Sequence, residues 1–151
     1  KYVQRKYSKH KGKRTKQRLA ILHEKVTNQR KDFLHKTSSE LIKNHDSLAI
    51  EDLAVSNMVK NHNLAQAISD ASWSTFVSML QYKADWYGKE IIKIDRYYAS
   101  SKTCGCGVKN ENLKLSDRVW TCSSCFSIND RDLLASQNIL KEGRRSLGDL
   151  G

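Results

Sequence analysis

Four cysteines constrain this chain most, because all of them fall within one polar stretch from Cys104 to Cys125. Cys122 and Cys125 are separated by two residues, a spacing that lets a tight turn direct both thiolates at one Zn²⁺. The earlier pair is Cys104 and Cys106, with fifteen residues between the two pairs. This interval is typical of a zinc ribbon, in which two knuckles meet at one metal. We therefore predict a structural zinc site, since four thiolates leave no coordination position open for chemistry.

The first cysteine pair departs from the usual pattern, because one residue separates its members instead of two. The usual knuckle turn cannot form there, although Gly105 and Gly107 give the backbone freedom to adapt. Free buried thiols or a redox pair are the alternative interpretation. No secretory signal is visible and the apolar stretches are far too short for a membrane span, so we expect a cytoplasmic protein without a membrane partner. In that reducing compartment, clustered thiols favour metal over disulfides.

Positive charge is concentrated near the start of the chain. The net charge is +11, and Lys1–Lys31 contains twelve Lys or Arg residues and one acid, Glu24. Clustered charge of this kind favours a phosphate backbone as partner, whereas the alternative is a basic surface kept for solubility. We predict nucleic-acid binding and no small-molecule substrate. The residues expected to bind nucleic acid are Lys9, Lys11, Lys13, Arg14, Lys16 and Arg18.

Hydrophobic periodicity predicts helices and strands in alternation. The expected order is helix 14–39, strand 47–50, loop 57–63, helix 64–87, strand 90–95, cysteine-rich segment 100–127 and helix 130–141. Such alternation indicates an α/β layer fold. Two strands are too few for a stable sheet, so we expect the missing strands to come from upstream sequence or from another chain.

The apolar faces of the three helices follow from the same periodicity. The first helix is expected to bury Leu19, Leu22, Val26 and Phe33. The second is expected to bury Leu64, Ile68, Ala71, Phe76 and Met79, and to end at Gly88. The last is expected to pack through Leu133, Leu134, Ile139 and Leu140, and to end at Gly143. The chain then divides into a basic flexible arm (1–13), a partial core (14–99), a zinc-ribbon insert (100–127), a final core helix (128–143) and a loose tail (144–151).

Two acidic residues stand at the ends of predicted core elements. Glu51 follows a buried strand, and Asp132 lies in the first turn of the last helix. Carboxylates so placed could hold Mg²⁺, although phosphodiester cleavage by two metals needs several carboxylates around a site about 4 Å across. By themselves, Asp130 and Asp132 are more typical of helix capping, and Glu51 of a surface or salt-bridge residue.

The chain resembles the OrfB/TnpB transposase family of insertion sequences in the joint order of seven short motifs. The motifs lie between Arg14 and Gly143, and they are Ala49–Leu53, Met58–His62, Ile68–Trp73, Tyr87–Glu90, Ser101–Cys104, Leu115–Arg118 with Trp120–Cys122, and Asp130–Asp132 with Gln137–Leu140. The resemblance implies the C-terminal half of an RNase H-like (RuvC-type) nuclease core with an inserted zinc ribbon. It also implies a relationship to type V CRISPR effectors and an RNA-guided DNA endonuclease, with DNA and guide RNA as partners.

The resemblance further implies an Asp, a Glu and a second Asp that hold Mg²⁺ or Mn²⁺. The family's Glu falls on Glu51 and its last Asp on Asp132. The first Asp belongs to a strand that precedes the long basic helix, and this chain does not contain it. Besides the short first cysteine pair, Leu134–Ser136 stands where the family has Asn-Ala-Ala, and Phe126 stands where it has Gly. With a start that lacks Met, these departures lead us to expect a truncated, decayed copy.

Three readings of function remain open from the sequence. The first is part of a metal-dependent, RNA-guided endonuclease. The second is a catalytically inactive remnant that binds nucleic acid and carries a zinc ribbon. The third is an inert fragment that does not fold alone. The missing Asp separates the first two, because two carboxylates rarely complete a two-metal site.

Overall fold

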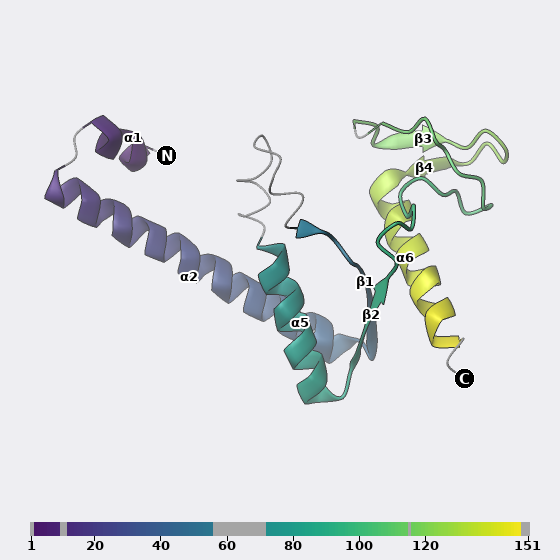
Figure 1. The fold of residues 1–151 in the computed structure, drawn as a ribbon, viewed down its shortest axis with the longest axis horizontal. Helices are drawn as coiled ribbons and strands as arrows, with labels where there is room; N and C mark the ends of the chain where they lie inside the picture. The colour runs from purple at the N-terminus through teal and green to yellow at the C-terminus, as the bar shows by residue number, and fades with distance from the viewer. Residues whose placement is uncertain (1, 10–11, 56–71, 115, 149–151) are drawn as a thin grey trace.

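The computed structural model of the chain describes residues 2–9, 12–55, 72–114 and 116–148. Its elements are α1 (Tyr2–Lys9), α2 (Lys13–Asn44), β1 (Ser47–Glu51), α5 (Trp73–Tyr87), β2 (Glu90–Ile94), β3 (Val119–Thr121), β4 (Ile128–Asp130) and α6 (Arg131–Gly148). This order confirms the predicted mixture of helices and strands (Figure 1). The predicted loop 57–63, and Leu64, Ile68 and Ala71 of the second helix, lie outside the described residues. None of the described helices is long and apolar enough to cross a membrane.

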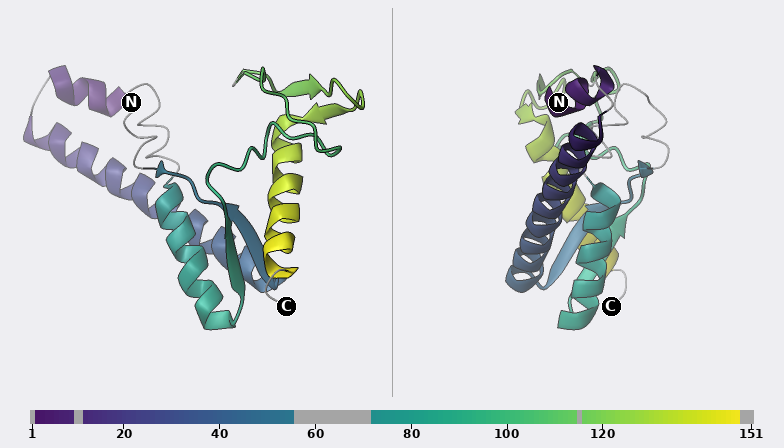
Figure 2. Two further views of the ribbon diagram at one scale, coloured as in Figure 1. Left: turned by 45° about the vertical axis from the view of Figure 1, so that its right-hand side comes forward. Right: turned by 90° about the vertical axis from the view of Figure 1, so that its left-hand side faces the viewer.

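Among the described residues, a two-stranded parallel sheet lies between the helices. β1 and β2 pair in register from Ser47 opposite Glu90 to Glu51 opposite Ile94. Parallel neighbours need a long crossover connection, and α5 lies within it. The strands lie between α5 on one side and α6 on the other (Figure 2). The sheet is therefore the middle layer of a helix–sheet–helix arrangement.

Alternation along the strands assigns each face of the sheet to different helices. Leu48 and Ile91, which are register partners, pack against a core of Ile42, Leu80 and Ala84 from α2 and α5. The next pair along the strands, Ala49 and Ile92, faces Gly143 of α6. Glu51 is two residues beyond Ala49, so it lies on the α6 face of the sheet.

A buried lysine joins α5 to α2. The Lys83 ammonium group donates hydrogen bonds of 2.7 Å to the His35 carbonyl and to the hydroxyls of Ser38 and Ser39. Burial lowers the pKa of Lys83, and the nearby charge of Lys43 lowers it further. The apolar pattern could not predict this contact, because Lys83 and Ser38 are polar residues at core positions.

The first residues of the chain differ from the expected flexible arm. Tyr2–Lys9 forms the helix α1, which folds back beside the start of α2 (Figure 1). Tyr2 and Val3 lie along a shallow hollow that Leu19, Leu22 and Val26 of α2 complete. The arm is therefore a helix in contact with α2, although none of its residues is buried.

The predicted buried face of α2 is wrong over most of its length. Leu22, Val26 and Phe33 are exposed, Phe33 with 65% of its surface, and Leu19 is half-buried. The buried residues of α2 are Ser38 and Ile42. α5 contacts α2 near its C-terminal end, at His35, Ser38 and Ser39, so the rest of α2 projects from the core. Figure 1 shows this projection.

The last helix is longer than predicted and buries a different face. α6 runs from Arg131 to Gly148, so Gly143 does not end it and the expected loose tail is helical as far as Gly148. Leu133 and Leu140 are exposed, whereas Leu134, Asn138 and Gly143 are buried. Leu134 and Asn138 are four positions apart and share one face, whereas Gly143 lies on the opposite side of the helix from Leu134, against β1. The predicted ribbon boundary also moves, because β4 extends the hairpin to Asp130.

We predict that Gly143→Ala destabilises the chain. A Cβ atom at position 143 would lie 2.6 Å from the Cβ of Ala49, so α6 would have to move away from β1. Overpacking of this kind costs about 1–3 kcal/mol, which exceeds the gain of at most about 1 kcal/mol in helix propensity. Denaturant unfolding measures the change. Gly148→Ala is the matched control, since nothing lies within 4 Å of a Cβ there. Equal stability of the two variants would contradict the close contact.

Candidate metal centre, carboxylates and basic surface

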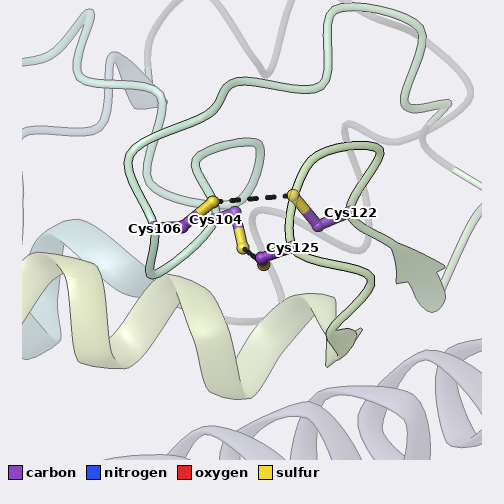
Figure 3. A group of neighbouring side chains, drawn as sticks. All are labelled: Cys104, Cys106, Cys122 and Cys125. Atoms are coloured by element: carbon purple, nitrogen blue, oxygen red, sulfur yellow. Dashed lines mark hydrogen bonds between the residues drawn. The ribbon is translucent and has the colours of Figure 1, made fainter.

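The four cysteines meet at one point of the ribbon (Figure 3). Their sulfur atoms all lie within 4.8 Å of one another. Cys104 Sγ lies 3.6 Å from Cys125 Sγ, and Cys106 Sγ lies 3.6 Å from Cys122 Sγ. Tetrahedral Zn²⁺ with Zn–S bonds of about 2.3 Å separates its sulfurs by about 3.8 Å. The cluster is therefore consistent with a structural zinc, and its four thiols fit the ion.

Both knuckles close by backbone hydrogen bonds, although the first is one residue shorter. In the first, the Gly107 amide donates to the Cys104 carbonyl and the Cys104 amide donates to Val108, each at 2.8 Å. In the second, the Phe126 amide donates to the Cys122 carbonyl at 3.1 Å. The missing residue thus gives a tighter turn, which still brings Cys106 next to Cys122.

The residue that follows each cysteine pair has a left-handed backbone. Gly107 has φ of +91°, and Phe126 has φ of +59°. Glycine adopts this region without steric cost, whereas other L-residues pay roughly 1–2 kcal/mol. Phe126 gains little packing in return, because 77% of its surface is exposed. The geometry gives a physical reason for glycine at this position of a knuckle.

Two polar residues beside the cysteines were not predicted from the sequence. Ser127 Oγ lies 3.2 Å from both Cys104 Sγ and Cys125 Sγ, and Asn129 Nδ2 donates to Ser127 Oγ at 3.2 Å. The Ser127 hydroxyl and the Cys106 backbone amide lower the pKa of Cys104 from 9.0 to about 6. Ser127 also lowers the pKa of Cys125. These groups favour the thiolate form that binds metal.

The ribbon is attached to α6 by its own small core. Cys104, Cys122 and Trp120 are buried together with Leu134, and Leu113 packs against them. Leu134 belongs to α6, so the metal centre rests directly on that helix. The β3–β4 hairpin then runs into α6 without a loop, because β4 ends at Asp130 and α6 begins at the next residue.

Glu51 ends β1 and is held by a residue from the segment after β2. Ser100 Oγ donates to Glu51 Oε1 at 2.5 Å. Ser100 is buried, and its carbonyl accepts a hydrogen bond of 2.8 Å from Asn138 Nδ2 of α6. Neither Ser100 nor Asn138 was singled out in the sequence, because nothing in their local pattern marks them as buried.

Asp130 and Asp132 have different roles at the start of α6. Asp130 Oδ1 accepts hydrogen bonds from the backbone amides of Asp132 and Leu133, at 3.0 and 2.9 Å, which is helix capping. Asp132 is exposed and forms an ion pair of 2.9 Å with Arg118. Asp132 is thus the residue of the two whose carboxylate does not cap the helix.

The described carboxylates do not by themselves form a site for divalent metal. Among the described residues, the cysteines are the one group of three or more His, Cys, Asp or Glu side chains close enough to share an ion. Glu51 and Asp132 do not belong to such a group. A Mg²⁺ or Mn²⁺ centre that uses them needs a further ligand from elsewhere in the protein.

The basic residues predicted to bind nucleic acid are solvent-exposed where they are described. Lys9 ends α1. Four more of them lie in the first two turns of α2, namely Lys13, Arg14, Lys16 and Arg18. Lys11 lies outside the described residues. α1 and α2 lie side by side, so these cations belong to one end of the molecule.

Comparisons with known proteins match both halves of the chain. The profile of the OrfB_IS605 family, described as "Probable transposase", matches residues 1–62. The profile described as "Cas12f1-like, TNB domain" matches residues 73–139, which include the ribbon.

Individual relatives agree with these profiles. Proteins of Streptomyces pristinaespiralis and Escherichia coli (strain K12) are named "Putative RNA-guided DNA endonuclease", the second with the suffix InsQ. They are 47% and 30% identical over 132 and 147 residues, each covering 87% of this chain. "TnpB-like protein L79" of Acanthamoeba polyphaga mimivirus is 32% identical over 127 residues, or 80% of this chain. The matches cover 33%, 37% and 24% of these three relatives, so the chain spans about a third of their length or less.

We predict one zinc per chain and its loss in Cys106→Ser. Replacing one of four thiolates removes a ligand from a site whose stability depends on all of them. Elemental analysis of the purified wild type and variant measures the zinc content per chain. A competing chelator then ranks their affinities for zinc. Ser123→Ala is the matched control, since Ser123 lies in the second knuckle and is exposed. Zinc retained equally by both variants would show that the metal is held elsewhere.

Proposed function

The chain belongs to the OrfB/TnpB family, and from this premise we propose that it forms the ribbon-bearing part of an RNA-guided DNA endonuclease. We infer that the parallel sheet and its helices belong to an RNase H-like (RuvC-type) core, into which the zinc ribbon is inserted. DNA and a guide RNA are the partners of the whole protein. The names of the relatives and the two family profiles support this assignment.

In this proposal, Cys104, Cys106, Cys122 and Cys125 hold a structural zinc that shapes the ribbon. Glu51 and Asp132 are the carboxylates that this chain contributes to a centre for Mg²⁺ or Mn²⁺. One observation carries the assignment of the carboxylates. Ser100 connects Glu51 to Asn138, and Asn138 lies six residues from Asp132, which is about 9 Å along a helix. The end of β1 is therefore tied to the same part of α6 that carries Asp132.

A nucleic-acid-binding protein that cannot cut is the second candidate. The ion pair between Asp132 and Arg118 favours it, because Arg118 occupies the carboxylate that a metal would need. The exposed cations of α1 and α2 would serve either function. Cleavage and binding must therefore be measured separately.

We predict that the 151-residue chain alone does not cleave DNA with Mg²⁺ or Mn²⁺, because its described carboxylates do not complete a metal centre. Fusion to the part of the Streptomyces pristinaespiralis relative that lies outside the match, with guide RNA, should restore cleavage. Glu51→Ala should then abolish it, and Glu90→Ala should not, since Glu90 stands at the other end of the sheet. The assay uses plasmid and single-stranded DNA. Metal-dependent cutting by the chain alone, lost in Glu51→Ala, would contradict the prediction.

We predict that the chain binds duplex DNA without sequence preference through its basic end. Each phosphate contact steepens the fall of log K with log salt by about 0.9. Replacing Lys13 and Lys16 with Gln should therefore reduce the slope by up to about 1.8. Replacing Lys141 and Arg144 of α6 with Gln is the control for net charge. A salt titration with a flat affinity, or equal slopes for the two double variants, would refute the assignment.

A further inference from the structure

A half-buried turn lies between the carboxylate of Glu51 and the metal centre. Its residues run from Ala99 to Thr103, directly before Cys104. The Thr103 amide and hydroxyl both donate to the Ala99 carbonyl, at 3.2 and 2.8 Å. The turn is thus internally closed, and its position depends on what holds it from outside.

Asn138 of α6 holds both sides of this turn. Its Nδ2 atom donates to the Ser100 carbonyl at 2.8 Å and to the Thr103 carbonyl at 2.7 Å. The side chain is 6% exposed, so water does not compete for these bonds. A buried amide with both donor hydrogens satisfied by two carbonyls fixes their relative position. The ribbon begins at the residue after Thr103, so the same amide also anchors the ribbon.

Ser100 connects the anchored turn to Glu51. Its hydroxyl donates to Glu51 Oε1, while its carbonyl accepts from Asn138. Ser100 is 6% exposed. Glu51 Oε2 accepts no hydrogen bond from the described residues. One carboxylate oxygen is therefore fixed and the other is left available, which is how outer hydrogen bonds orient a carboxylate that binds metal.

We propose that Ser100 and Asn138 are positioning residues that orient the Glu51 carboxylate and link its placement to the zinc-bound ribbon. The role of Glu51 as a metal ligand rests on the proposed function, whereas its link to the ribbon does not. The path is short and continuous. It runs from Cys104 through the Thr103 carbonyl to Asn138, then through Ser100 to Glu51. Removing zinc loosens Cys104, and this releases the turn that holds the carboxylate.

The test compares Ser100→Thr with Ser100→Val in the full 151-residue chain. The two side chains have the same shape, so any disturbance from the extra methyl group is shared, and they differ in the hydroxyl alone. Circular dichroism and zinc content establish that each variant folds and loads one zinc. Carbon NMR of the glutamate carboxylates, with Glu51 assigned from Glu51→Gln, then gives two readouts.

The first readout is the response of the Glu51 signal to zinc removal by a chelator. We expect a shift in the wild type and in Ser100→Thr that reverses when zinc returns, and no response in Ser100→Val. Glu90, at the opposite end of the sheet, is the internal control and should not respond. Asn138→Asp, which keeps the size of the side chain but cannot donate, should lose the response as Ser100→Val does. A wild-type Glu51 signal indifferent to zinc, or equal responses in the Thr and Val variants, would overturn the proposal.

The second readout is the broadening of the Glu51 signal by Mn²⁺ in the fusion to the Streptomyces pristinaespiralis relative, because the carboxylates of this chain need a further ligand. It separates this proposal from the proposed function. Loss of an outer hydrogen bond typically lowers metal affinity 10–100-fold, so Ser100→Val should need roughly 10-fold more Mn²⁺ than Ser100→Thr. If the two variants needed equal Mn²⁺ concentrations, the result would contradict a positioning role for Ser100. If Mn²⁺ broadens Glu51 in no variant while the zinc response follows the hydroxyl, the link to the ribbon stands and the metal-ligand role of Glu51 fails.

Discussion

The packing of α6 against both the sheet and the ribbon is the contact on which the described structure depends. This helix places Leu134 in the ribbon core, Asn138 on the turn before Cys104, and Gly143, on its opposite side, on Ala49 of β1. In the part of the chain that the structure describes, the sheet has two strands, too few for stability without cover on both faces. The helix therefore covers one face of the sheet and also packs against the core of the zinc ribbon. A shift of α6 would disturb both together.

The sequence predicted what local pattern determines and missed what long-range contact determines. The alternation of helices and strands and the meeting of the four cysteines followed from periodicity and spacing. The buried residues of α6 did not, because Leu133 and Leu134 are equally apolar and the choice between them depends on the ribbon core that Leu134 joins. The sequence also could not predict that Phe33 is exposed, because its exposure depends on how far α5 extends along α2. Ser100 gave no local signal, because its partner Glu51 lies 49 residues away.

The two candidate metal centres differ in how they are built. The cysteine centre draws all four ligands from one short stretch whose turns close on themselves, and α6 is the element outside that stretch on which it packs. The carboxylates come from separate elements. Glu51 depends on Ser100 for its orientation, and Asp132 is engaged by Arg118. A zinc ribbon can therefore persist in a family member whose cleavage chemistry has been lost, and zinc content is no measure of nuclease competence.

The length of α2 has a consequence for electrostatics. From Lys13 to Leu34, where burial begins, the helix extends about 30 Å. The screening length at physiological ionic strength is about 8 Å, so the potential of the basic end has largely decayed at the core. The basic end can therefore bind a polyanion without altering the electrostatic potential around Glu51 and Asp132. Within the described residues, α2 and its Lys83-bonded contact with α5 are the physical connection between the two regions.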